Sequence, residues 1–154
     1  MSAVHTAVGH LPDFAGKPAR KIFDTAKQHL AMKNPLFIGD RIDTDILGAN
    51  NAEIDSALVF TGIATGKETI SAAKGSRPPY LLENVSEILE KHKAPKKTKY
   101  GFKSGSAQVE LLGNKVRLIS SGSRIEVLRA ACSVVWGSEQ AIYALDVQAD
   151  LYWE

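Results

Sequence analysis

Residues 36–46 read Leu36-Phe37-Ile38-Gly39-Asp40-Arg41-Ile42-Asp43-Thr44-Asp45-Ile46. The apolar run at the start, bounded by Asn34-Pro35 and by Gly39, is typical of a short buried parallel strand. Three carboxylates then follow at the carboxyl end of that strand, where α/β sheets place their ligand sites. Since like charges repel, a cation is the natural compensator, and Mg²⁺ prefers oxygen ligands of this kind. An acidic helix N-terminus, favoured by the helix dipole, explains the same residues without a metal.

Helical and strand periodicities alternate over the first 90 residues around this stretch. Strands separated by helices of this size predict βαβ units, so the expected fold class is α/β, with a partial doubly wound, Rossmann-like parallel sheet. The expected strands are 36–38, 56–60 and 80–82. The expected helices are 18–32, 44–52, 65–74 and a last one capped by Asn84, with Val85, Ile88 and Leu89 on its apolar face.

A second motif, Gly16-Lys17-Pro18, stands at the start of the first expected helix. A Lys beside a helix N-terminus offers a phosphate both an ammonium group and free backbone N–H groups. The same tripeptide is also an ordinary way to begin a helix, because Pro suits the first turn. Lys17 and Asp40 belong to adjacent strand–helix units, so we expect them to meet at one edge of the sheet.

Three motifs in this order resemble the C-terminal half of a haloacid dehalogenase (HAD) superfamily phosphatase. They are Gly16-Lys17-Pro18, the stretch 37–49, and Leu58-Val59-Phe60-Thr61-Gly62. The resemblance covers about residues 2–90. It is to the subgroup that holds the nucleotide phosphatase of N-acetylglucosamine operons, phosphoglycolate phosphatase and 4-nitrophenyl phosphatase.

The resemblance implies a role for each charged residue of the motifs. Lys17 would screen the charge of the phosphoryl group and of an aspartyl nucleophile. Asp40 would ligate Mg²⁺, and Asp45 would support the metal through its waters or neighbours. Arg41 and Asp43 would lie near the substrate or around the metal site, and ion pairing is the favoured role for Arg41.

Two parts of such phosphatases have no counterpart in this sequence. The family attacks with an Asp-x-Asp motif near its N-terminus and selects substrates with a cap domain, whereas Asp43-Thr44-Asp45 is the one Asp-x-Asp here. We therefore expect a Mg²⁺-dependent phosphatase of small phosphate monoesters, with glycerol 3-phosphate favoured, that lacks its nucleophile and is inactive alone. The alternative is a non-catalytic phosphate- and metal-binding or regulatory protein derived from this fold.

The C-terminal third differs in character from the first 91 residues, which we expect to form the HAD-like half-core. Residues 92–104 form an expected Lys-rich linker, and residues 105–154 a small α+β region. That region reads as a hairpin over 107–119, a helix over 123–135 that buries Cys132, and a strand over 141–147. This order resembles part of an acetyltransferase (GNAT) fold, found as a C-terminal region in some actinobacterial phosphatases of the subgroup.

Composition and charge narrow the remaining possibilities. Hydrophobic residues make up 44% and charged residues 23% of the chain, typical of a globular protein, and no apolar run is long enough for a membrane helix. A single Cys and the absence of a signal peptide favour the cytoplasm. Six Lys between residues 91 and 103 are interpreted as a solvated stretch, which makes nucleic acid an unfavoured partner. Half of a doubly wound sheet leaves an open edge, so we expect self-association or a partner chain.

Overall fold

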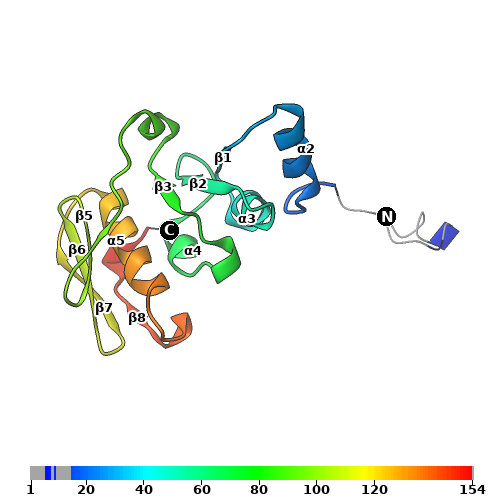
Figure 1. Ribbon diagram of the computed structural model, residues 1–154. Coiled ribbons are helices and arrows are strands. Elements are labelled where there is room, and N and C mark those ends of the chain that lie inside the picture. The colour runs from blue at the N-terminus through cyan, green and yellow to red at the C-terminus, as the bar shows by residue number, and fades with distance from the viewer. Residues whose placement is uncertain (1–5, 8, 10–14, 154) are drawn as a thin grey trace.

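Two β-sheets with one long helix between them form the architecture (Figure 1). The computed structural model describes residues 6–7, 9 and 15–153. The first sheet is parallel, with the order β1-β2-β3, and consists of β1 (Leu36–Gly39), β2 (Asp55–Val59) and β3 (Tyr80–Leu82). The expected α/β class with a parallel sheet is therefore confirmed.

Strand β1 lies at an edge of this sheet. β2 pairs with β1 on one side and with β3 on the other, so its side chains after Asp55 are buried. β1 has a partner on one side alone, and its residues are exposed or half-buried rather than buried as expected. Within the described residues, the other edge of β1 is unpaired, as predicted for an incomplete doubly wound sheet.

The helices around the first sheet are shorter than the periodicity predicts. Helix α2 spans Lys21–His29, because residues 16–20 form a turn instead of the first helical turn. The expected helix 44–52 is a π-helix over Ile42–Ile46 followed by α3 (Leu47–Asn51). Helix α4 (Gly66–Ile70) begins with a capping box formed by Thr65 and Glu68.

The helix expected after Asn84 is a 3₁₀ helix over Val85–Leu89. The side chain of Asn84 caps it, as predicted, by accepting from the N–H of Ser86. The residues of its expected apolar face, Val85, Ile88 and Leu89, are exposed. The apolar spacing of these three residues therefore does not correspond to a buried helix face.

The second sheet has five strands, and two of them lie within the residues of the expected linker. Strands β4 (Lys96–Lys97) and β5 (Gly101–Ser104) lie inside residues 92–104 and pair antiparallel, so part of this segment belongs to the sheet. The expected hairpin is confirmed as β6 (Ala107–Leu112) and β7 (Lys115–Ser120), and Gly113 takes a positive φ of 65° at the turn. The expected strand 141–147 is a 3₁₀ helix over Ile142–Ala144 and the short β8 (Asp146–Val147), parallel to β7.

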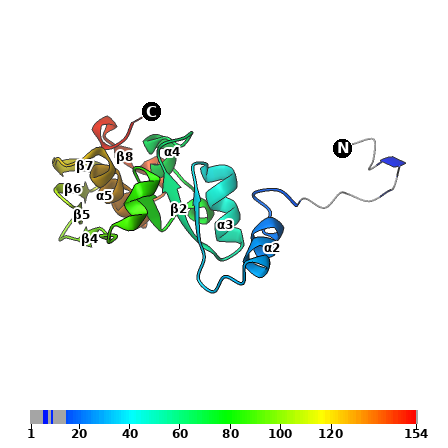
Figure 2. The ribbon, with the colours of Figure 1, turned by 90° about the horizontal axis from the view of Figure 1, so that it is seen from above.

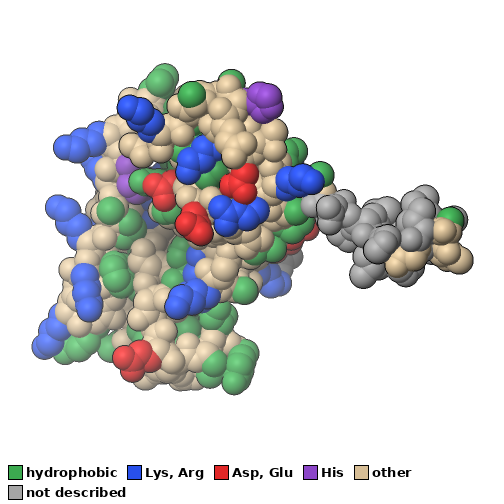
Figure 3. Space-filling view, turned by 45° about the vertical axis from the view of Figure 1, so that its right-hand side comes forward, with side chains coloured by type: hydrophobic (Ala, Val, Ile, Leu, Met, Phe, Trp, Pro, Cys, Tyr) green, Lys and Arg blue, Asp and Glu red, His purple; other side chains and the backbone are tan. Residues whose placement is uncertain are grey.

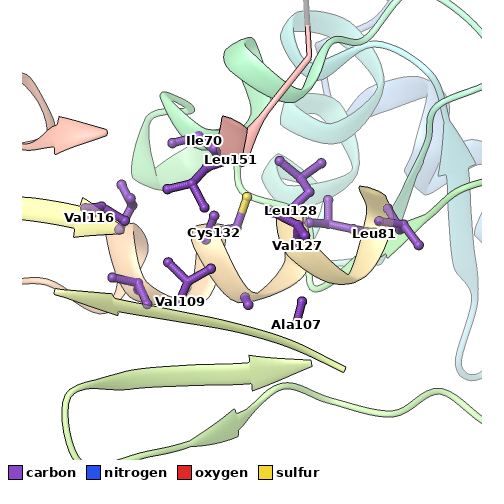
Figure 4. Packing of buried hydrophobic residues seen from close by; sticks show 14 of the residues in the cluster. Ile70, Leu81, Ala107, Val109, Val116, Val127, Leu128, Cys132 and Leu151 are labelled. Carbon is purple, nitrogen blue, oxygen red and sulfur yellow. The ribbon is translucent and has the colours of Figure 1, made fainter. Parts of the chain in front are cut away.

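Helix α5 (Arg124–Trp136) joins the two sheets into one core. Ser123 and Glu126 form a capping box at its N-terminus. Figure 4 shows α5 between the second sheet and Ile70 and Leu81 of the first part of the chain. Cys132 is fully buried there, and burial raises the pKa of its thiol, in agreement with a core role.

One face of the molecule shows how its basic side chains are distributed. In Figure 3, the Lys and Arg side chains along the left side of the molecule are spaced apart from one another. Among the described residues, every helix is too short or too polar to cross a lipid bilayer.

Candidate functional site

Lys17 and Asp45 meet at the carboxyl end of β1, although 28 residues separate them in the sequence. The Nζ atom of Lys17 lies 2.6 Å from Oδ1 of Asp45. The Asp45 side chain is 5% exposed, whereas that of Lys17 is 44% exposed. The ammonium therefore neutralises a buried carboxylate while it keeps part of its surface in contact with water. The sequence predicted that Lys17 meets Asp40; the contact of Lys17 in the structure is with Asp45 of the same motif.

The second oxygen of Asp45 is bound by the backbone that follows β1. Oδ2 accepts from the N–H groups of Asp40, at 3.3 Å, and of Arg41, at 3.2 Å. This packing depends on Gly39, because a Cβ atom there would lie 2.4 Å from the Cβ of Asp45. With both oxygens engaged, Asp45 serves as a structural anchor that holds Lys17 and the Asp40 backbone together.

Asp40 is held by the loop that connects β2 to α4. Its Oδ2 accepts from the N–H of Ile63 at 3.3 Å, and its carbonyl oxygen accepts from the N–H of Ala64 at 3.0 Å. Gly62 packs directly on the carboxylate, since a Cβ there would lie 1.9 Å from Oδ2. No described residue donates a hydrogen bond to Oδ1 of Asp40, which leaves that oxygen available for a ligand.

A cavity of about 260 Å³ opens beside Asp40. Arg41 donates two hydrogen bonds to Asp43, at 3.1 and 2.8 Å, across the rim. The bond from Arg41 holds the pKa of the Asp43 carboxyl below its usual value, so the pair stays ionised. Ion pairing, the favoured role of Arg41, is thus what the structure shows. The cavity is lined by Asp40, Arg41, Ile42, Asp43, Ile63, Ala64 and Glu68.

Lys17 does not line this cavity. It lies at the rim of a second, apolar cavity of about 240 Å³ between α2 and β1. Lys17 also precedes α2 by a full turn of chain instead of standing at its N-terminus. The helix N–H groups expected beside Lys17 are therefore not part of the site, and its ammonium is the group that remains for a phosphate.

The described residues contain no complete metal centre. Nowhere in the described part of the chain do three or more His, Cys, Asp or Glu side chains cluster as metal ligands would. Asp45 already accepts from three donors, whereas Oδ1 of Asp40 is an oxygen of the cavity lining that could bind a cation. One or two carboxylates with waters and a phosphate are usual for Mg²⁺. The remaining ligands must come from outside this set.

The sequence did not assign a role to the loop 61–64. The sequence Thr61-Gly62 is typical of a turn after a strand. No feature of the neighbouring sequence indicates that the backbone N–H groups of Ile63 and Ala64 bind Asp40. One feature could have indicated it. Gly62 follows β2, the strand beside the one that precedes the Asp cluster, and a Gly at such a position lets the backbone approach a ligand group closely.

Comparison with known proteins agrees with this geometry. Residues 14–88 match the family described as HAD-hydrolase-like. D-glycerol 3-phosphate phosphatase of Mycobacterium tuberculosis is 29% identical over 150 residues, which are 92% of this chain and 41% of that protein. Glycerol-3-phosphate phosphatase of Gallus gallus is 31% identical over 98 residues, 58% of this chain and 31% of that protein.

Solved structures give the same result. The crystal structure of a glycerol phosphate phosphatase from M. tuberculosis in complex with magnesium superimposes with a TM-score of 0.74 at 28% identity, covering 96% of this chain and 43% of that one. The same phosphatase has also been crystallised with calcium. A 4-nitrophenylphosphatase from Thermotoga maritima superimposes with a TM-score of 0.50 at 29% identity over 60% of this chain.

The fold of the chain is that of its HAD-fold structural neighbours. Residues 14–88, just under half of the chain, match the HAD-hydrolase-like family, and the relatives to which the chain is similar include glycerol-3-phosphate phosphatases. The chain spans about two fifths of the length of the mycobacterial relative. The match to that relative covers 92% of the chain, so it includes most of the C-terminal region as well as the HAD-like part.

Proposed function

We propose that the chain is the part of a Mg²⁺-dependent phosphatase that holds the phosphate-screening Lys and one metal ligand, and that it is inactive without a segment carrying the nucleophile. The observation that carries the proposal is the Lys17–Asp45 contact beside Asp40 at the carboxyl end of a parallel strand. This is the place where α/β sheets bind ligands.

Each residue has a distinct part in this proposal. The ammonium of Lys17, held by Asp45, would offset negative charge on a phosphoryl group. The free Oδ1 of Asp40 would contribute one ligand to Mg²⁺, which would polarise the phosphoryl oxygen when bound. Arg41 and Asp43 would border the substrate from the rim of the cavity.

The missing groups would enter along the open edge of β1. A strand added there places its own carboxyl end beside Asp40, because parallel strands end at one edge of a sheet. An Asp-x-Asp at the end of that strand would supply both the nucleophile and further metal ligands. The same unpaired edge supports self-association or a partner chain as an expectation.

Small phosphorylated metabolites are the proposed substrate class, with glycerol 3-phosphate first. Support comes from the names of the mycobacterial and chicken relatives. A cytoplasmic location and the likeness of residues 105–154 to an acetyltransferase stay predictions. The second sheet packed on α5 is compatible with that likeness.

Complementation tests the proposal. The chain is mixed with the part of the mycobacterial relative outside the match, and phosphate release from glycerol 3-phosphate is measured with Mg²⁺. We expect activity when the two parts are mixed and none from either part by itself. Asp40→Asn or Lys17→Met in this chain should abolish the activity of the mixture. Arg20→Met is the matched control, because Arg20 is a nearby exposed cation that pairs with Asp24.

Association without activity would refute the catalytic proposal. The chain would then fit the alternative, a phosphate- and metal-binding protein. That alternative predicts that Mg²⁺ with phosphate raises the melting temperature of the chain alone, and that Asp40→Asn removes the rise.

A further inference from the structure

The last described residues of the chain lie against the element that holds Asp40. Leu151 is buried in the shared core and anchors this segment. The residues after it run beside helix α4, at the end that follows the β2–α4 loop (Figures 1 and 2). A residue at the far C-terminus thus reaches the neighbourhood of the candidate site.

Trp153 contacts both ends of the loop 61–65. At the strand end, its ring packs edge-to-face on Phe60, with 5.0 Å between ring centroids and an angle of 73°. At the helix end, its carbonyl oxygen accepts from the N–H of Lys67 at 3.2 Å. Gly66 allows this approach, because a Cβ there would lie 3.0 Å from the backbone nitrogen of Trp153.

The Trp153 ring also contacts a cationic side chain. The guanidinium of Arg124 lies 5.0 Å from the centroid of the ring. Arg124 is fixed in turn by a 2.8 Å ion pair with Glu83, which follows β3. An aromatic side chain fixed in this way can restrain the loop ends that it touches.

The middle of the same loop supplies the amides that orient Asp40. Ile63 donates to Oδ2 and Ala64 to the carbonyl oxygen of that residue. Because the loop is five residues long, fixing its two ends restricts where these N–H groups can lie. The direction of the free Oδ1 then depends on the position of a residue 113 positions further along the chain.

We propose that Trp153 is a positioning residue that clamps the loop 61–65 and thereby fixes the carboxylate of Asp40. The C-terminal region would then be a working part of the phosphatase and not an appended module. The inference rests on the proposed function for its link to metal binding, but the clamp itself can be tested separately.

Amide hydrogen exchange in the full chain tests the clamp. In Trp153→Ala we expect the N–H groups of Ile63 and Ala64 to exchange about tenfold faster than in the unchanged protein, the factor that the loss of one aromatic pair gives. The buried Leu58 amide of β2 serves as the reference for global stability. Trp153→Phe keeps an edge-to-face ring and should restore most of the protection.

Tyr143→Ala is the matched control, because Tyr143 is an aromatic residue of the same region and is 95% exposed. It should leave all three amides unchanged. Equal acceleration of the Leu58 amide in Trp153→Ala, or no acceleration at Ile63 and Ala64, would overturn the clamp.

Activity of the complemented protein separates the two proposals. Trp153→Ala should raise the half-saturating Mg²⁺ concentration about tenfold while kcat changes little. If the complemented protein has no activity but exchange responds as expected, the clamp stands and the phosphatase proposal fails. If activity is present and exchange does not respond, the clamp alone fails.

Discussion

The ion pair between Lys17 and Asp45 should be a strong energetic coupling in this protein. Lys17→Met removes the ammonium but keeps much of the side-chain volume. Asp45 would then remain buried, with 5% of its side chain exposed and two backbone N–H bonds longer than 3 Å. The coupling energy of this pair therefore tests whether Lys17 and Asp45 hold each other in place within the folded protein.

The expected magnitude follows from burial on the two sides of the pair. Breaking a fully buried ion pair costs about 3–5 kcal/mol. The Lys17 side chain is 44% exposed, so water screens part of the interaction. We therefore expect Lys17→Met to lower the free energy of unfolding by about 1–3 kcal/mol, the cost of leaving a buried charged acceptor short of a donor.

A double-mutant cycle in urea measures the coupling. The variants are Lys17→Met, Asp45→Asn and the pair of changes together, and an unchanged m-value shows that the denatured state is comparable. Arg41 and Asp43 provide a comparison on the same loop, since both are exposed and their pair should show no measurable coupling. A Lys17–Asp45 coupling below about 0.5 kcal/mol, the usual limit of additivity, would refute the reasoning.

Two further predictions use the same measurement. Gly62→Ala should lower the free energy of unfolding by about 1–3 kcal/mol, because its Cβ would overlap the Asp40 carboxylate, whereas Gly75→Ala, whose Cβ would have 3.9 Å to its nearest neighbour, should not; equal effects would contradict this. Burial, and then Arg129, lower the pKa of His92, so the folded state disfavours its protonation. Stability should consequently fall as the pH drops from about 6.5 through the lowered pKa, and His92→Gln should fall less; a pH profile unchanged by that substitution would disprove the assignment.

Local patterns predicted the elements that depend on local sequence. The three parallel strands, the β6–β7 hairpin and α5 with its Ser123 cap follow from apolar runs, a Gly turn and a capping box. The same patterns do not reveal pairing between distant segments. The six Lys between residues 91 and 103 predict a solvated stretch, and they do not show that Lys96 pairs with Lys103 between β4 and β5, or that β5 pairs with β6. The exposed residues Val85, Ile88 and Leu89 carry a helical pattern that no neighbouring element covers.

Part of the candidate site could be predicted from the sequence and part could not. Lys17 could be placed near the acidic motif that contains Asp40 because adjacent strand–helix units end at one edge of a sheet, and this reasoning needs no side-chain detail. It did not identify Asp45 as the partner of Lys17. The orientation of Asp40 could not be predicted, because its donors are backbone amides of Ile63 and Ala64, which have no signature in the side-chain sequence.

The proposed dependence of Asp40 on Trp153 could not be predicted from local sequence either. It combines a ring contact with Phe60, a backbone hydrogen bond from Lys67 and a Gly66 that permits close approach. Treating residues 1–91 and the C-terminal region as separate parts would leave out this dependence. One core contains residues of both parts, and Trp136 donates to the carbonyl oxygen of Ile70 across the junction. Removal of the C-terminal region should therefore expose the face of α4 and loosen the loop that holds Asp40. A variant shortened after residue 91 that kept the Ile63 and Ala64 amides protected would show that the two parts are independent.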